Sequence, residues 1–117
     1  MPRSILFADD DKSMLSLYAR IFSGTDYSIS TAVTFHQAEE LIRANDYDLL
    51  VTDFMFPDGR GTELIDIFKE KKAGGKSMLV TGSAIAPERA QLEGLDGYFE
   101  KPFRVNDLLA AIAEALG

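Results

Sequence analysis

The sequence contains no cysteine, a single histidine, and no apolar stretch that approaches the length of a membrane span. Without cysteine the chain forms neither a disulfide framework nor a thiolate metal site, as is usual in a reducing compartment. The N-terminus runs from Met-Pro-Arg directly into a short apolar segment and lacks the core of a signal peptide. We therefore expect a cytoplasmic protein that does not associate with a membrane.

Basic residues are also scarce relative to acidic ones. The chain has 12 Lys and Arg against 19 Asp and Glu, which gives a net charge of −7. A nucleic-acid surface needs clustered Lys and Arg, so binding of nucleic acid by this domain is not expected. The length of 117 residues and the hydrophobic fraction of 46% suit one domain with one core, and no linker or repeat interrupts it. We predict a single domain over residues 1–117.

Strand-like and helix-like segments alternate five times along the chain. Apolar runs predict strands over residues 5–8, 27–32, 49–52, 78–81 and 97–100, the second of them half-polar as at a sheet edge. Helical spacing predicts helices after Asp11, over residues 34–44, 62–73 and 87–93, and after Pro102. Residues 54–61 read as a loop. Five β-α units imply an α/β fold with a doubly wound, mostly parallel sheet.

The same spacing identifies the buried face of each helix. Asp11 is a candidate N-cap of the first helix, and Thr34 with Gln37 resembles a capping box for the second. The inward-facing residues are predicted to be Met14, Leu15, Tyr18, Ile21 and Phe22; Ala38, Leu41 and Ile42; Leu64, Ile65 and Phe68; and Leu108, Leu109, Ile112 and Leu116. The segment 87–93 offers few apolar anchors, so its helix is expected to be short.

Acidic residues directly follow two of the predicted strands. Asp9, Asp10 and Asp11 come after the first strand, and Asp53 lies at the end of the third. The carboxyl ends of parallel strands open on one crevice, where such sheets bind ligands. Like charges held close together raise each other's pKa unless a cation neutralises them, and Mg²⁺ prefers carboxylate oxygens. The pattern predicts a divalent-cation site at this edge of the sheet.

Two further groups are expected at the same edge. Thr81 ends the fourth predicted strand and Lys101 follows the fifth. Together with the acids they can hold Mg²⁺ and a phosphoryl group, because the metal bridges carboxylate and phosphoryl oxygens. Lys101 can contact a phosphoryl oxygen as a point charge, and Thr81 can donate a hydrogen bond to another. Asp53 is the candidate nucleophile, since carboxylates can form covalent acyl phosphates.

This set, its order and its spacing resemble the response-regulator receiver domain, the CheY-like family of two-component signalling. The matching positions are Asp9 and Asp10, the acid pair; Asp53 with Met55, Pro57 and Gly61 behind it; Thr81, the switch hydroxyl; Tyr98, the switch aromatic; and Lys101, Pro102 and Phe103. The resemblance covers essentially the whole chain. It implies a flavodoxin-like fold: a five-stranded parallel sheet of order 2-1-3-4-5 with five helices.

The resemblance also implies a function. Asp53 would accept a phosphoryl group from the phosphohistidine of a sensor histidine kinase or phosphotransfer protein. Asp10, Asp53 and the backbone carbonyl of Met55 would ligate Mg²⁺, and Asp9 would act mostly through water. The protein would be a switch rather than an enzyme, with only intrinsic Mg²⁺-dependent autophosphorylation and autodephosphorylation.

The same family implies how the signal would leave the domain. Thr81 and Tyr98 would reorient when the acyl phosphate forms, and would change a surface near the fourth helix and fifth strand. The output partner that reads this surface is unknown. The last helix carries no lysine or arginine from Val105 to Gly117, so the charged dimer contacts of receivers that drive winged-helix factors are poorly supported.

Two other functions compete with this one. The chain could be a receiver-shaped scaffold that works without phosphorylation, or a haloacid-dehalogenase-type phosphatase that uses the acids of residues 9–13. Simpler roles also exist for single residues: Asp9 and Asp10 as first-turn acids, Tyr98 as a half-buried strand aromatic, and residues 69–72 as a solvated helix end. His36 is expected to be exposed and to carry no phosphate.

Overall fold

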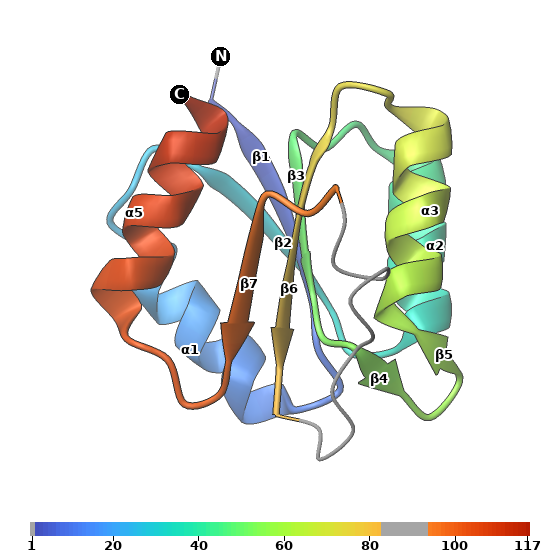
Figure 1. Ribbon diagram of the computed structural model, residues 1–117, viewed down its shortest axis with the longest axis horizontal. Helices are drawn as coiled ribbons and strands as arrows, with labels where there is room; N and C mark the ends of the chain where they lie inside the picture. Colours follow the sequence, from blue (N-terminus) through green and yellow to red (C-terminus); the bar gives the residue numbers. More distant parts are fainter. Residues whose placement is uncertain (1, 83–93) are drawn as a thin grey trace.

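The computed structural model describes residues 2–82 and 94–117, in which helices cover both faces of a central sheet (Figure 1). The strands of that sheet are β1 (Ser4–Ala8), β2 (Ser28–Ala32), β3 (Leu49–Thr52), β6 (Lys76–Thr81) and β7 (Gly97–Glu100). The helices are α1 (Lys12–Phe22), α2 (Phe35–Ala44), α3 (Gly61–Lys71) and α5 (Val105–Leu116). None of these helices combines the length and apolarity that crossing a membrane requires. The helix predicted over residues 87–93 lies outside the described residues.

All neighbouring strands of the sheet are parallel, in the order β2-β1-β3-β6-β7. If only the strands of this sheet are counted, the order is the expected 2-1-3-4-5. The register pairs Ala8 with Thr52, Thr52 with Leu79, and Thr81 with Glu100. The carboxyl ends of β1, β3, β6 and β7 therefore reach one edge of the sheet, and the residues that follow them are brought together there.

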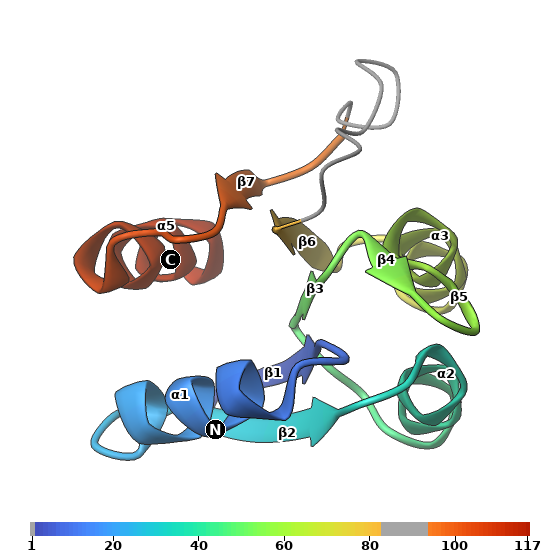
Figure 2. The same ribbon diagram turned by 90° about the horizontal axis from the view of Figure 1, so that it is seen from below.

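Each face of the sheet has its own hydrophobic core, because side chains alternate along a strand. Helices α1 and α5 cover one face, and α2 and α3 cover the other (Figure 2). On β1, Ile5 and Phe7 face α1 and α5, whereas Leu6 and Ala8 face α2 and α3. Most of the predicted inward residues are buried; Met14, Leu15, Ile21, Leu41 and Leu109 are partly buried and pack against the cores.

Both helix caps that the sequence predicts are present. The Asp11 carboxylate accepts a hydrogen bond from the Ser13 amide at 2.9 Å and thereby caps α1. At α2, Thr34 Oγ1 accepts a hydrogen bond from the Gln37 amide at 3.0 Å. Gln37 Oε1 in turn accepts from the amide of Val33 at 2.8 Å, one residue before the cap. These reciprocal bonds satisfy amides that lack partners within the helix.

The predicted loop of residues 54–61 contains a small antiparallel hairpin that the sequence did not reveal. It pairs β4 (Met55–Phe56) with β5 (Gly59–Arg60). Strands of two residues are too short to show a period, so the sequence shows only the turn residues between them. At the base of the hairpin, the Gly61 amide donates to the Phe54 carbonyl at 2.8 Å.

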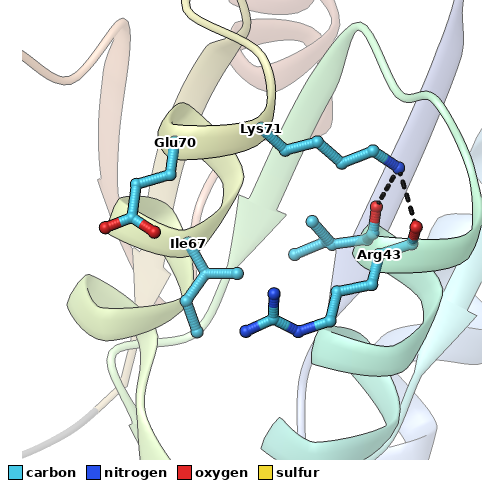
Figure 3. Close-up of a pocket in the computed structure, with 5 residues that line it drawn as sticks. Arg43, Ile67, Glu70 and Lys71 are labelled. Carbon is cyan, nitrogen blue, oxygen red and sulfur yellow. Dashed lines mark hydrogen bonds between the residues drawn. The ribbon is translucent and has the colours of Figure 1, made fainter.

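The lysines at the end of α3 bind other groups instead of forming a simple solvated helix end. Lys71 Nζ donates to the carbonyls of Ile42 and Arg43 at the end of α2, at 2.6 and 3.0 Å (Figure 3). A cation there suits the negative end of the helix dipole. These residues line a hollow of about 350 Å³ together with Ile67 and Glu70. Because Lys71 already binds the carbonyls of α2, we interpret this hollow as a structural contact between α2 and α3.

Candidate functional site

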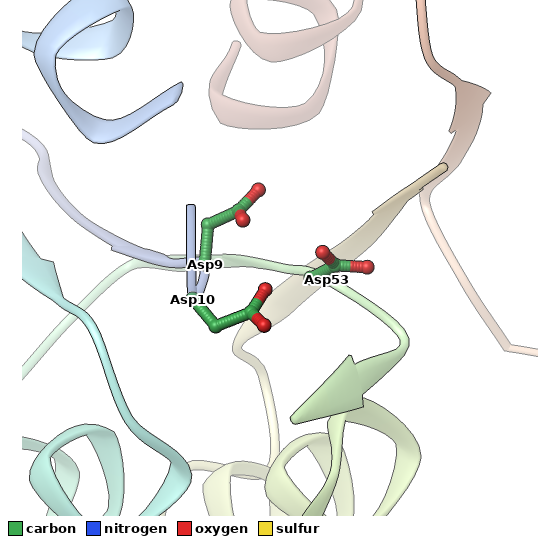
Figure 4. Close-up of side chains that lie close together, drawn as sticks. All are labelled: Asp9, Asp10 and Asp53. Carbon is green, nitrogen blue, oxygen red and sulfur yellow. The ribbon is translucent and has the colours of Figure 1, made fainter. Parts of the chain in front are cut away.

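The three predicted metal-binding acids lie together at the carboxyl edge of the sheet. Asp9 and Asp10 follow β1 and Asp53 follows β3 (Figure 4), and one carboxylate oxygen of each lies within 4.8 Å of the others. Asp9 and Asp53 are buried, with 1% and 8% of their surface exposed. Asp10 is exposed and faces solvent at the mouth of the cluster. The predicted convergence of these carboxylates is confirmed.

The parallel ladder continues one residue past each strand and so fixes the backbone of this cluster. The Asp9 amide donates to the Ala32 carbonyl at 3.0 Å, and the Asp53 amide donates to the Ala8 carbonyl at 2.9 Å. Asp53 Oδ1 accepts a hydrogen bond from the Phe54 amide at 2.7 Å. This bond orients the carboxylate and leaves Oδ2 directed toward the centre of the site.

Lys101 reaches the cluster from the far end of the chain. Its Nζ donates to Asp9 Oδ2 at 2.8 Å and to Asp53 Oδ2 at 3.3 Å. The Lys101 amide also donates to the Thr81 carbonyl at 2.8 Å, which extends the pairing of β7 with β6 by one residue. The lysine thus contacts two carboxylates from two different strands, as its place in the sequence predicted.

Burial and neighbouring charges have opposing effects on the pKa values of both Asp9 and Lys101. Burial raises the pKa of Asp9 to about 6, against the lowering effect of the hydrogen bond from Lys101. Burial alone would lower the pKa of Lys101, but the hydrogen bonds and charges of Asp9 and Asp53 outweigh it and raise that pKa. Lys101, whose side chain keeps 20% of its surface exposed, therefore stays cationic at neutral pH.

The donor set fits a small divalent cation. Three carboxylates and one ammonium leave two uncompensated negative charges in the cluster. Carboxylate oxygens, one of them open to solvent, are the ligands that Mg²⁺ takes while keeping several waters. The backbone carbonyl of Met55, two residues beyond Asp53 on β4, is the further ligand that the family resemblance implies.

The two predicted switch residues lie on the strands next to the site. Thr81 ends β6 and is buried, with 3% of its surface exposed. Tyr98, on β7, pairs with Leu79 of β6 and is partly buried against the core beneath α2 and α3. Burial, with the charge of Glu100, raises the pKa of the Tyr98 hydroxyl. Their positions next to the site are compatible with the predicted role.

A stack of aromatic rings reaches the loop that carries Lys101. The sequence did not assign these rings to the site. The ring of Phe7 stacks on Tyr18 at 4.3 Å between centroids, and Tyr18 stacks on Phe103 at 6.4 Å. Phe103 is two residues after Lys101, so the stack joins the lysine loop to α1 and β1. The only sequence signal was Phe103 itself, as part of the Lys-Pro-Phe triplet.

Position 61, in the loop after Asp53, has room only for glycine. A Cβ atom there would overlap the backbone carbonyl oxygen of Asp53. Any other residue would displace the start of α3 or the backbone of the site. Asp58, in the turn of the hairpin, was not singled out from the sequence, unlike Gly61; its carboxylate accepts hydrogen bonds from the amides of Phe35 and His36.

The remaining candidates lie outside the cluster. His36 is exposed on α2, where its Nε2 is 2.9 Å from a Glu40 carboxylate oxygen. Asp11 is occupied as the cap of α1, where Ser13 also donates its hydroxyl at 2.6 Å. The predicted exposure of His36 and the predicted cap by Asp11 are confirmed.

The model of a family described as "Response regulator receiver domain" matches residues 5–113. The chain belongs to the response regulator receiver domain family. The crystal structure of a CheY-like receiver domain protein from Methanospirillum hungatei JF-1 is 30% identical, with a TM-score of 0.92 over 99% of this chain and 94% of that one. A structure described as the BeF3-activated DrrB receiver domain is 27% identical, with a TM-score of 0.83 and coverage of 99% and 98%.

A curated relative of this receiver domain is longer than the chain. The photosynthetic apparatus regulatory protein RegA of Rhodobacter capsulatus is 28% identical over 112 residues, which are 94% of this chain. The chain spans about 61% of the length of RegA. The likeness therefore concerns only part of that regulator.

Proposed function

We propose that Asp53 is the phospho-acceptor of this receiver domain and takes its phosphoryl group from the phosphohistidine of a sensor kinase or phosphotransfer protein. The observation that carries this proposal is the position of Lys101 Nζ, 3.3 Å from Asp53 and 2.8 Å from Asp9. A lysine held between two buried carboxylates provides a cation next to the oxygen that would be phosphorylated. The beryllofluoride activation named for the DrrB receiver domain supports the same chemistry.

In the proposed transfer, an oxygen of the Asp53 carboxylate attacks the phosphorus. A new O–P bond forms while the N–P bond of the phosphohistidine breaks, and the leaving imidazole nitrogen takes up a proton. Lys101 stays charged and neutralises a phosphoryl oxygen, since it already contacts Asp53 Oδ2. Thr81 donates its hydroxyl to a second phosphoryl oxygen. The ion pair with Asp9 holds the lysine in place.

Asp10, Asp53 and the Met55 carbonyl would hold Mg²⁺, with Asp9 acting mostly through water. When bound, the cation offsets charge on the phosphoryl oxygens. The burial of Asp9 suits a group that acts on its neighbours more than on solvent. The exposure of Asp10 suits a ligand at the entrance of the site.

The acyl phosphate would act by changing the protein surface. Thr81 and Tyr98 reorient toward the modified site, and the surface near β7 changes with them. The domain is then a binding module whose partner reads that surface, and its own chemistry is limited to gaining and losing the phosphoryl group.

Acetyl phosphate tests the proposal without a kinase. With Mg²⁺ present, the purified protein should gain the mass of one phosphoryl group, and Asp53→Asn should abolish the gain. Asp11→Asn is the matched control, because it removes a neighbouring acid that caps α1 and should leave labelling intact. Equal labelling of Asp53→Asn and the unmodified chain would contradict the proposal.

The phosphorylation-independent scaffold is the alternative that uses the same fold. It predicts that Mg²⁺ and beryllofluoride leave the NMR signals of Tyr98 unchanged, whereas the switch predicts that they shift. The dehalogenase-type phosphatase has lost its support. Such an enzyme would use the acid two residues after its nucleophile, and Asp11 is engaged as a helix cap instead.

A further inference from the structure

Asp58, in the turn of the β4–β5 hairpin, joins this hairpin to helix α2. Its two carboxylate oxygens accept hydrogen bonds from the amides of Phe35 and His36, both at 3.0 Å. The hydrogen bond from the His36 amide lowers the pKa of Asp58, and the bond from Phe35 lowers it further. The carboxylate therefore accepts these bonds in its charged form, across more than twenty residues of sequence.

The local cap of α2 leaves these two amides to Asp58. Thr34 accepts from the Gln37 amide, and its carbonyl accepts from the Ala38 amide at 3.1 Å. The amides of Phe35 and His36, the first two of the helix, lie outside the reach of this capping box. The hairpin thus completes the cap of α2, and α2 in turn fixes the tip of the hairpin.

Gly59 of the hairpin also packs closely against Phe35, in the same first turn of α2. A Cβ atom added to Gly59 would lie 2.5 Å from Cγ of the Phe35 ring. Gly59 is the first residue of β5 and pairs with Phe56 on β4. The glycine therefore allows a close approach between the hairpin and the helix. Two independent contacts fix the tip of the hairpin relative to α2.

The base of the hairpin is fixed at the phosphoryl site itself. Gly61 packs against the Asp53 carbonyl and donates its amide to Phe54 at 2.8 Å. Met55 lies between these anchors and pairs with Arg60. The family resemblance implies that its backbone carbonyl is a metal ligand, a role in which its side chain has no part. Its position must come from the backbone around it.

We propose that Asp58 is a positioning residue for the metal site: by anchoring the hairpin to α2, it holds the Met55 carbonyl where Mg²⁺ binds. This inference rests on the proposed function, in which Met55 is a ligand of Mg²⁺. Groups that orient a ligand raise metal affinity because the site does not have to be ordered when the ion arrives. Helix α2 then acts as a fixed support for one side of the site.

The test compares Asp58→Ala with Thr34→Ala in the full chain. Both variants remove a cap of α2, so both should lower the melting temperature by a similar amount. Only Asp58→Ala should weaken Mg²⁺ binding, by about tenfold in Kd, the lower end of the range for groups that orient metal ligands. Calorimetric titration with MgCl₂ measures this Kd. A Kd in Asp58→Ala equal to that of Thr34→Ala would overturn the proposal.

Asp58→Asn separates positioning from simple loss of charge. Its amide keeps one acceptor oxygen, so the positioning role predicts a Kd between those of the unmodified chain and Asp58→Ala. Equal Kd values for the Asn and Ala variants would mean that only the charge matters, which also overturns the proposal.

Labelling by acetyl phosphate gives a readout of the same variants on the reaction. Asp58→Ala should need about tenfold more Mg²⁺ for half-maximal labelling yet reach the maximal rate of the unmodified chain. A lower maximal rate at saturating Mg²⁺, with unchanged half-saturation, would overturn the positioning role. If the unmodified chain is not labelled at Asp53 at all, the proposed function fails, and the calorimetric comparison still tests the hairpin.

Discussion

The two faces of the sheet hold the site in different ways. On the face covered by α1 and α5, a stack of aromatic rings, Phe7, Tyr18 and Phe103, reaches the loop that carries Lys101. On the face covered by α2 and α3, polar anchors connect the elements: Asp58 binds the start of α2, and Lys71 binds its end. The first face positions the ammonium group, and the second positions the hairpin with Met55.

The two sides of the site therefore depend on different kinds of interaction. Ring stacking is insensitive to salt and pH, and it depends on buried area and shape. Hydrogen bonds that a carboxylate accepts or an ammonium donates near the surface depend on charge and compete with water. Substitutions on the two faces should therefore differ in what they change.

The largest expected difference comes from replacing one phenylalanine on each face by leucine. Phe7 has ring contacts with Tyr18 at 4.3 Å and Phe22 at 5.2 Å, whereas Phe68 pairs with no other ring in the described part of the chain. Phe68→Leu should cost about 1 kcal/mol, and Phe7→Leu about 2–4 kcal/mol because two ring pairs are lost as well. Urea unfolding measures both, and equal losses would contradict the comparison.

A smaller effect is expected at the polar anchor of α2. Lys71→Met removes an ammonium from the last carbonyls of the helix and should cost about 1–2 kcal/mol in unfolding free energy. The labelling rate of Asp53 should not change, since this end of α3 is far from the carboxyl edge of the sheet (Figure 1). Lys76→Met is the control: its ammonium lies 3.9 Å from Asp96, a weak surface pair. A slower labelling in Lys71→Met would mean that the anchors are coupled to the chemistry.

Asp48 is a third polar anchor, and the pH dependence of the unfolding free energy tests its contribution. The amide of Ser4 donates to it at 2.9 Å and lowers its pKa, and Lys72 adds to the effect. A carboxyl group with a lowered folded pKa stabilises the protein above its unfolded pKa of about 4 and loses that contribution as the pH falls through its folded value. Asp48→Asn should thus be less stable by under about 1 kcal/mol near neutral pH, and the gap should close below about pH 4. A gap independent of pH would refute this assignment.

The smallest effect is expected at Ser77, a buried residue of β6. Its hydroxyl oxygen has no hydrogen-bond partner within the described residues. Ser77→Ala should change the unfolding free energy by less than about 0.5 kcal/mol or stabilise the protein slightly, since no hydrogen bond is lost. Ser4→Ala is the comparison, because that hydroxyl donates to the Asp46 carbonyl at 2.9 Å. A loss above about 1 kcal/mol in Ser77→Ala would reveal a partner for this hydroxyl.

The sequence predicted the sheet and the convergence of the site because both follow from short-range patterns. Apolar runs mark the buried parallel strands, and strand ends such as Asp9, Asp53 and Lys101 meet wherever the strands are parallel. The helix caps at Asp11 and Thr34 were also visible, because each cap contacts a residue two or three positions away.

The contacts that the sequence did not reveal join residues far apart. Asp58 stands in a Pro-Asp-Gly turn, where aspartate is common, so nothing marks it as the cap of a helix more than twenty residues earlier. Lys71 stands in a basic helix end that is equally ordinary, although it binds carbonyls of α2. Such roles depend on how elements pack, which composition does not encode.

The most direct test of the central claim is to identify the atom that carries the phosphoryl group. An acyl phosphate formed from acetyl phosphate and Mg²⁺ can be reduced with borohydride, which converts the modified aspartate to homoserine. Peptide mapping by mass spectrometry then locates it. We predict homoserine at position 53 alone, where the carboxylate faces Lys101. Homoserine at position 9 or 10, or at no aspartate while the protein is labelled, would contradict the account.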